Sequence, residues 1–184
     1  MMPRIPSFLT FAALALAVAL MAAAPARSSS APELPAAVRA QLTATYPGWR
    51  FARLDPRVQP ELVAEPGRRR SPEWVSGDFD GDGRTDYAVQ IVRPGPADSA
   101  QVVLAFLARR GGYQRSVLTT FGEHLGFYLR TSRRGERVLD LDKDPMGDSS
   151  IVLRHDAVDI PSTEGTGMTC LYEHARWRCV TSGD

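Results

Sequence analysis

The residues of this chain best suited to chemistry are acids gathered within residues 78–89. They stand at positions 1, 3, 5 and 9 of that stretch: Asp78, Asp80, Asp82 and Asp86. Gly83 occupies position 6, where a sharp turn needs a residue without a side chain. Carboxylates this close together repel one another, so a cation is their natural partner. The hard cation Ca²⁺ prefers such oxygen ligands, and the backbone carbonyl of Arg84 offers one more.

The stretch resembles the short calcium loops of FG-GAP and VCBS repeats, which are also seen in dockerins and thrombospondin type 3 repeats. The matching residues, at 77–89, read Gly-Asp-Phe-Asp-Gly-Asp-Gly-Arg-Thr-Asp-Tyr-Ala-Val. The resemblance implies Ca²⁺ bound between β-strands, without flanking EF-hand helices, by the following ligands: Asp78, Asp80, Asp82, the carbonyl of Arg84, and Asp86. The alternative is a tight acidic turn whose carboxylates cap backbone N–H groups without a metal.

Two departures limit that resemblance. Val89 stands at position 12, so the bidentate Glu of an EF-hand is missing and we expect weak calcium affinity. The motif also occurs once, which excludes a propeller built from many such repeats.

A second group of acids repeats the spacing of the first. Its members are Asp140, Asp142, Asp144 and Asp148. Pro145 takes the place that corresponds to Gly83, and the fixed φ of proline cannot make the same turn. We therefore expect a polar strand end with solvated acids at 140–148, with a second calcium site as the alternative.

Cys170 and Cys179 are the only cysteines of the chain, and an isolated pair in an oxidising compartment predicts a disulfide. A two-residue turn at His174-Ala175 places them opposite each other, at a position where the side chains of antiparallel strands approach most closely. The same register pairs Tyr172 with Trp177 on one face. A redox-active pair is the alternative, but the C-x8-C spacing differs from the reactive C-x-x-C motif.

The beginning of the chain has the pattern of a secretory signal peptide. Arg4 precedes an apolar run over residues 8–24, and Ala24-Pro25-Ala26 forms a small-residue cleavage site. We expect residues 1–26 to be removed, leaving a single secreted α+β domain at 27–184 that is periplasmic or secreted. No stable membrane span is expected after cleavage, a retained anchor being the alternative.

The charge of the expected mature chain is balanced. Cleavage removes Arg4 and no acid, which leaves basic and acidic residues equal in number. A balanced domain has no global field to attract nucleic acid or membranes. The one basic run, Arg68-Arg69-Arg70, lies in a stretch flanked by Pro and Gly and is expected to be a solvated loop. We therefore expect no nucleic-acid partner.

The predicted fold class is α+β, with an N-terminal helix packed on a mostly antiparallel β-sheet and a disulfide-closed C-terminal β-hairpin. The helix, at 35–45, follows from one apolar stripe with a spacing of four: Leu34, Val38, Leu42 and Tyr46. Residues 86–119 predict a meander of three strands. A loop followed by a short strand is expected within 121–129, and a strand at 137–141. Residues 151–153 and 157–160 are expected to form two short strands or one bent strand, and loops are expected at 54–73 and 161–167.

Signals for catalysis are weak. His155-Asp156 and the serines of the chain supply the residue types of a Ser-His-Asp triad, but no G-x-S-x-G elbow is present. Glu123, Glu136 and the acidic loops contain no distinct pair for glycoside hydrolysis. The three histidines lack the spacing of a zinc site, and no glycine-rich phosphate loop occurs.

The expected function is that of a calcium-stabilised exported domain that binds a protein or a cell-envelope component. The alternative is a secreted hydrolase with unrecognised catalytic residues. A pocket holding His155 or His124 beside a carboxylate and a nucleophile would favour the hydrolase. A sheet face with exposed aromatic residues would favour the binding domain. The sequence specifies neither the partner nor the oligomeric state.

Overall fold

A computed structural model describes residues 33–52, 73–94, 101–122, 126–146, 148–163 and 165–183. The chain separates into two units, Met1–Glu33 and Leu34–Asp184, and every described helix and strand lies in the second. The expected signal peptide at 1–26 and most of the expected loop at 54–73, including its basic run, lie outside the described residues. No described helix is both long enough and apolar enough to cross a membrane.

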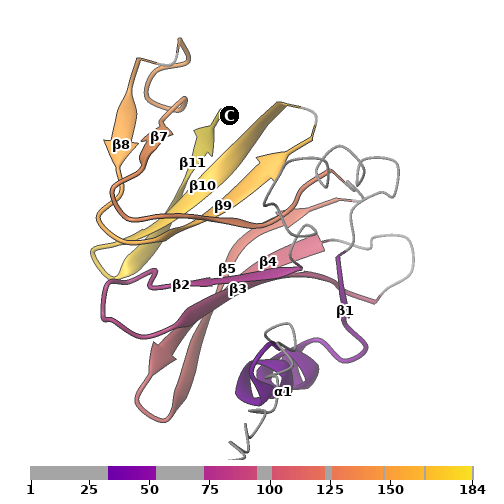
Figure 1. The fold of residues 1–184 in the computed structure, drawn as a ribbon. Helices are drawn as coiled ribbons and strands as arrows, with labels where there is room; N and C mark the ends of the chain where they lie inside the picture. The colour runs from indigo at the N-terminus through magenta and orange to yellow at the C-terminus, as the bar shows by residue number, and fades with distance from the viewer. Residues whose placement is uncertain are drawn as a thin grey trace, which may run out of the picture. The chain divides into compact units, whose positions relative to one another are not determined.

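Helix α1 (Ala36–Thr45) covers one face of a β-sheet (Figure 1). Its apolar stripe buries Val38 and Leu42 completely against strand residues such as Val89 and Ile91. Full burial of such side chains contributes about 1.5–3 kcal/mol each. The helix ends where Pro47-Gly48 turns the chain, with Gly48 at a φ of 76°. The predicted helix is confirmed.

The sheet beneath this helix is antiparallel. It consists of β1 (Arg50–Phe51), β2 (Trp74–Gly77), β3 (Asp86–Val92), β4 (Gln101–Arg109) and β5 (Gly112–Phe121). The order is β1-β3-β4-β5, and β2 also pairs with β3. The last three strands form the predicted meander. Residues 101–107 of β4 are all buried, because this strand is covered on both faces.

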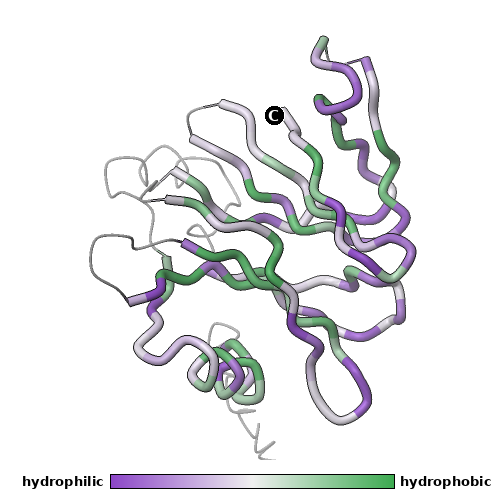
Figure 2. Tube along the Cα trace, turned by 180° about the vertical axis from the view of Figure 1, so that it is seen from behind, coloured by the Kyte–Doolittle hydropathy of each residue, from purple (hydrophilic) through white to green (hydrophobic). Residues whose placement is uncertain are grey.

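A second antiparallel sheet covers the other face of the first. It contains β6 (Arg130–Ser132), β9 (Ala157–Ser162), β10 (Gly165–Glu173) and β11 (Arg176–Ser182), in the order β11-β10-β9-β6. A small hairpin, β7 (Arg137–Leu139) with β8 (Ser150–Val152), lies outside it. The main core between the sheets includes Val103 and Leu107 from the first and Val158 and Ile160 from the second. Figure 2 shows the hydrophobic residues concentrated along these central strands.

The α+β class is therefore confirmed, and the structure adds that the β-strands form two main packed sheets. The loop expected at 161–167 is largely wrong, because β9 continues through Pro161 and β10 begins at Gly165. The pairing shifts register between Gly165 and Met168, which accommodates a proline within the sheet. A Cβ on Gly167 would lie 2.5 Å from the carbonyl oxygen of Ile160, so only glycine allows this close approach.

The C-terminal hairpin has the predicted register, with Cys170 paired to Cys179 and Tyr172 to Trp177. The disulfide is present, with its two Cα atoms 3.9 Å apart. The turn residues His174 and Ala175 both have positive φ, at 52° and 61°, as a two-residue turn of this hand requires.

Candidate cation site and adjoining pocket

The acidic loop is the connection of a β-hairpin. Strand β2 ends at Gly77, which pairs with Asp86, the first residue of β3. The intervening chain curls tightly, with Gly81 at a φ of 75° and Gly83 at 81°. Residues with side chains rarely adopt such angles, so these two glycines permit the loop conformation.

Three of the four predicted carboxylates converge. Oxygen atoms of Asp78, Asp80 and Asp86 lie within 4.8 Å of one another, an arrangement that could hold a metal ion. Asp82 stands apart from this group. One of its oxygens accepts the backbone N–H of Arg84 at 2.9 Å, and the other lies 3.9 Å from the Arg84 side chain. Coordination by Asp82 and by the Arg84 carbonyl stays a prediction.

Asp86 is the buried member of the cluster. Its two oxygens accept the backbone N–H groups of Phe79, at 2.9 Å, and of Ala108, at 2.7 Å. Burial raises the pKa of this carboxyl to about 6; the two hydrogen bonds oppose the rise, and the nearby charges of Asp80 and Asp82 add to it. Asp86 therefore fastens the loop to the end of β4 and holds a proton more readily than an ordinary aspartate.

Asp80 already has a cationic partner within the protein. The Arg109 guanidinium, at the end of β4, contacts its carboxylate at 2.5 Å. Hydrogen bonding to Asp80 is the main reason why the pKa of Arg109 is raised. This pair offsets one negative charge of the cluster, so a bound metal ion must share Asp80 with Arg109 or displace it.

Asp78 has an oxygen atom that the described fold leaves unsatisfied. Its Oδ2 accepts the backbone N–H of Gly83 at 3.1 Å. Its Oδ1 is buried and has no hydrogen-bond partner. Leaving such an atom unsatisfied costs about 1–3 kcal/mol, and more for a charged group. A metal ion at the cluster removes that cost, so the residues present fit a cation.

Asp156 anchors the loop from the segment that precedes β9, and sequence reasoning missed this role. Its Oδ2 accepts the backbone N–H of Asp78 at 3.2 Å, and its own N–H donates to the carbonyl of Asp78 at 3.2 Å. It also accepts the backbone N–H of Arg134 and a side-chain N–H of Arg133, at 3.1 and 2.9 Å. Burial by itself would raise the pKa of Asp156. The hydrogen bonds and the Arg133 charge together outweigh burial, so the pKa lies below its usual value.

Gly77 and Gly81 make room for Asp156 and its neighbour His155. These two glycines are the feature of the sequence from which the contact could have been predicted. A Cβ on Gly77 would lie 2.9 Å from Asp156 Oδ2. A Cβ on Gly81 would lie 2.1 Å from the Nδ1 atom of His155. Neither position is the one where the calcium-loop pattern requires glycine. Their presence therefore indicates that another segment packs against the loop.

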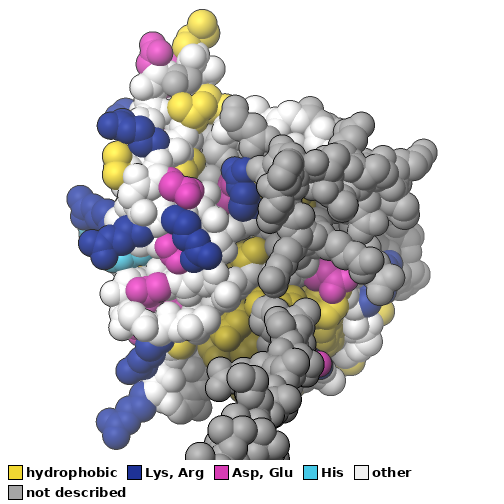
Figure 3. Space-filling view, in the orientation of Figure 1, with side chains coloured by type: hydrophobic (Ala, Val, Ile, Leu, Met, Phe, Trp, Pro, Cys, Tyr) yellow, Lys and Arg dark blue, Asp and Glu magenta, His cyan; other side chains and the backbone are white. Residues whose placement is uncertain are grey.

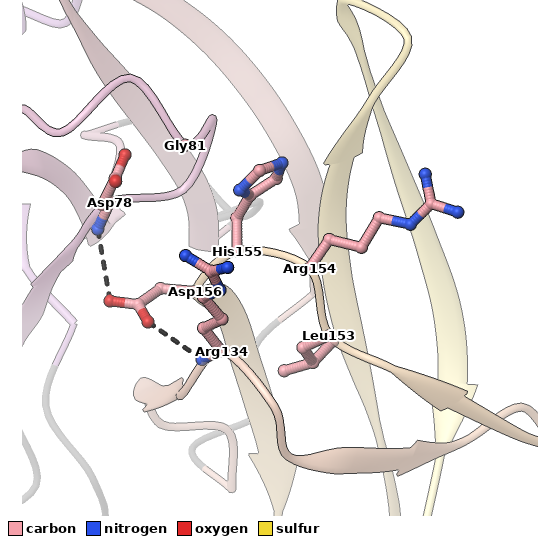
Figure 4. Close-up of a pocket in the computed structure, with 7 residues that line it drawn as sticks. All are labelled: Asp78, Gly81, Arg134, Leu153, Arg154, His155 and Asp156. Carbon is pink, nitrogen blue, oxygen red and sulfur yellow. Dashed lines mark hydrogen bonds between the residues drawn. The ribbon is translucent and has the colours of Figure 1, made fainter.

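A pocket of about 470 Å³ adjoins the loop (Figure 4). The described residues that line it are Asp78, Gly81, Arg134, Leu153, Arg154, His155 and Asp156. Figure 3 shows basic and acidic side chains intermixed, with a histidine among them, on the part of this face that the described residues form. The pocket brings His155 beside the carboxylates of Asp78 and Asp156. None of its described lining residues carries a hydroxyl or thiol nucleophile.

The second acidic stretch uses its carboxylates differently. Asp140 accepts the backbone N–H of Lys143, Asp142 that of Thr181, and Asp144 those of Met146 and Asp148. Among the described residues, the cluster of Asp78, Asp80 and Asp86 is the one able to hold a metal. The expected polar strand end is present, except that Asp140 is buried rather than solvated.

The tryptophans and Tyr172 are packed against the two cores rather than gathered on an exposed sheet face. Trp49 and Trp74 pack on the helix-side core, while Tyr172 and Trp177 pack on the core between the sheets. The large hydrophobic side chains exposed in the described part are Val117, Met146 and Val152, none of them aromatic. No aromatic face therefore marks a binding surface within these residues.

No protein-family model, curated protein or solved structure matches this chain. The likeness to FG-GAP and VCBS loops therefore rests on the loop residues and on their position between two paired strands.

Proposed function

We propose that this chain is an exported domain that binds Ca²⁺ in the loop at 78–86 and uses the stabilised fold to bind a protein or a cell-envelope component. One observation carries the metal part: the buried Oδ1 of Asp78 has no hydrogen-bond partner and belongs to a cluster of three convergent carboxylates. A cation satisfies that oxygen and relieves the repulsion within the cluster.

The chemistry of the donor set favours Ca²⁺ over other metals. The cluster offers carboxylate oxygens and neither nitrogen nor sulfur ligands, which disfavours zinc. Ca²⁺ accepts six to eight oxygens in irregular geometry, so backbone carbonyls and waters can complete its shell, whereas Mg²⁺ demands a near-ideal octahedron. Without a Glu at position 89, the expected dissociation constant is about 10⁻⁴–10⁻³ M, typical of extracellular modules.

The ion would act as a structural connection between segments. Asp86 is fastened to β4 through Ala108, and Asp78 is fastened to the segment before β9 through Asp156. An ion between these two carboxylates joins both sheets at the β2–β3 connection. At ten times its dissociation constant, a ligand that binds only the native state adds about 1.4 kcal/mol of stability.

Export is supported by the disulfide between Cys170 and Cys179, which fits an extracellular or periplasmic environment. The alternative, a secreted hydrolase, has less support from the pocket. The oxygens of Asp156 accept hydrogen bonds from Asp78, Arg133 and Arg134, and none from His155. Asp156 therefore does not orient the imidazole as a triad carboxylate does.

Thermal unfolding tests the metal part. The exported protein, freed of metal on a chelating resin, is titrated with Ca²⁺ to 10 mM, and its Tm is expected to rise with concentration. Asp78→Asn should remove the rise, since it neutralises a ligand while keeping an oxygen for the Gly83 N–H.

The matched control is Asp148→Asn, the same change at an exposed acid outside the cluster. It should leave the calcium response intact. A Tm that stays constant across millimolar Ca²⁺ in the unmodified protein rejects the metal site.

A further inference from the structure

The pocket beside the cation loop contains two arginine side chains that the described fold does not use. Arg134 and Arg154 both line it and are exposed. Neither guanidinium forms a hydrogen bond or ion pair with a described residue, whereas the neighbouring Arg133 pairs with Asp156 at 2.9 Å. In Figure 4 the Arg134 side chain lies beside His155 and Asp156, while the Arg154 side chain extends outward from beside Leu153, away from Asp78 and Arg134.

The charges around the pocket depend on the state of the loop. Two acids line it, Asp78 and Asp156. Asp156 is already satisfied by Arg133 and by two backbone N–H groups. Asp78 remains as the uncompensated negative charge, and it belongs to the cation cluster. A cation in the loop therefore leaves the pocket with two unpaired positive groups, Arg134 and Arg154.

We propose that this pocket binds a small molecule bearing an oxyanion, a carboxylate or phosphate-type group, through Arg134 and Arg154, and that Ca²⁺ in the adjoining loop strengthens the binding. The strengthening by Ca²⁺ rests on the proposed calcium function, whereas oxyanion binding by the two arginines does not depend on it. The guanidinium group offers a planar fork of N–H donors that matches such anions. The volume of about 470 Å³ lies within the range of small-molecule sites. Leu153 adds an apolar wall for the rest of the ligand.

Two probes with the same phenyl ring but different anionic groups distinguish a carboxylate ligand from a phosphate-type ligand. Benzoate presents a planar carboxylate and phenylphosphonate a tetrahedral oxyanion. Binding of each is followed by NMR chemical-shift changes at pH 7.5, with 5 mM Ca²⁺ and with protein made metal-free on a chelating resin. Soluble chelators are avoided, because they are polycarboxylates and compete for the pocket.

The variants are Arg134→Gln, Arg154→Gln and the double change. These side chains are exposed, so folding should be unaffected. Arg137→Gln, an exposed arginine on β7 outside the pocket, is the matched control. We expect at least one probe to bind with Ca²⁺ present, about tenfold weaker binding in each single variant, and no change in the control. The probe that binds more tightly identifies the ligand group.

Coupling between the sites must be reciprocal. Removal of Ca²⁺ should weaken probe binding several-fold, and saturating probe should raise calcium affinity by the same factor. Absence of saturable binding, or equal binding by the double variant, overturns the pocket. Calcium-independent binding in a protein that does bind Ca²⁺ overturns the coupling. If Ca²⁺ itself does not bind, the proposed function fails, while arginine-dependent probe binding would still support the pocket.

Discussion

Two stretches of this chain carry acids at the same spacing, and the fold treats them in different ways. At 78–86 three carboxylates converge, and one buried oxygen of Asp78 has no hydrogen-bond partner. At 140–148 the carboxylates of Asp140, Asp142 and Asp144 accept backbone N–H groups of the turn or of β11. Both stretches use carboxylates to fix the backbone, but among the described residues the first is the one that also gathers three of them and leaves a buried oxygen without a partner.

The difference follows from what surrounds each stretch. In the first, Gly81 and Gly83 allow positive φ, so the chain curls around its own carboxylates. Asp156 holds the beginning of that curl from the segment that precedes β9. In the second, Pro145 prevents the same turn. Spacing of acids alone therefore does not make a cation site, and the conformation of the intervening backbone decides it.

The largest expected effect tests the anchor of the first stretch. Gly81→Ala should destabilise the protein by about 2–4 kcal/mol, because it combines a disfavoured positive φ with a clash against His155. Gly83→Ala is the internal control, since its φ is similar but no atom lies within 4 Å of an added Cβ. It should cost only about 1–2 kcal/mol. Urea unfolding of both variants in 5 mM Ca²⁺ measures the difference.

The double variant Gly81→Ala with His155→Ala should recover the part due to the clash and leave the cost of the positive φ. Equal losses for the two glycine variants would mean that His155 moves aside freely. In that case the packing of His155 against Gly81 does not hold the loop, and, among the described residues, the Asp156 hydrogen bonds alone connect it to the segment before β9.

An effect of intermediate size is the pH dependence of stability, which should be opposite for the stretches at 78–86 and 140–148. Burial raises the pKa of Asp86 to about 6, so its contribution to stability is present below the unfolded value of 3.8 and is lost as pH rises through about 6. Hydrogen bonds from Thr181 lower the pKa of Asp142, so its contribution is present above the unfolded value and is lost as pH falls. In metal-free protein, acidification should favour the first stretch and weaken the second.

The same protonation should compete with the metal. Because Ca²⁺ binds the ionised carboxylate, its affinity is expected to fall about tenfold between pH 7.5 and pH 5. Calorimetric titration at the two pH values measures the change, and NMR titration of the carboxyl carbons assigns the proton to Asp86. An affinity that does not vary over this range argues against Asp86 as a ligand.

The features that were predicted from sequence depend mainly on neighbouring residues. The hairpin register from Cys170 to Cys179 follows from a two-residue turn and the pairing of two cysteines. Helix α1 follows from an apolar spacing of four, and the meander from strands joined by short turns. The convergence of Asp78, Asp80 and Asp86 follows from a pattern of nine residues.

The features that were missed depend on distant contacts. The second sheet pairs β6 with β9, and the anchor joins Asp78 to Asp156. Two local signals were available: the uninterrupted apolar run in β4, which indicates burial on both faces, and the additional glycines at positions 77 and 81. The bulge that carries Pro161 into β9 had no comparable signal, since proline and glycine are equally typical of loops.

The smallest expected effect is that of a variant that tests whether one glycine is enough to turn the stretch at 140–148 into a calcium site. Pro145→Gly restores the turn residue that the first stretch has, at an exposed position where the substitution should change stability by about 1 kcal/mol or less. We nevertheless expect no new calcium response, because the described carboxylates at 140–148 do not converge as those of Asp78, Asp80 and Asp86 do. Those of Asp142 and Asp144 instead accept N–H groups from separate places, Thr181 and the turn at Met146 and Asp148.

The measurement is calcium titration by thermal unfolding in an Asp78→Asn background, where the first site is silenced. A rise in Tm that appears only with Pro145→Gly would show that acid spacing and one glycine are sufficient. The anchoring contacts of the first stretch would then be dispensable for binding the cation. A constant Tm would instead support the view that acid spacing and one glycine do not bring the carboxylates together.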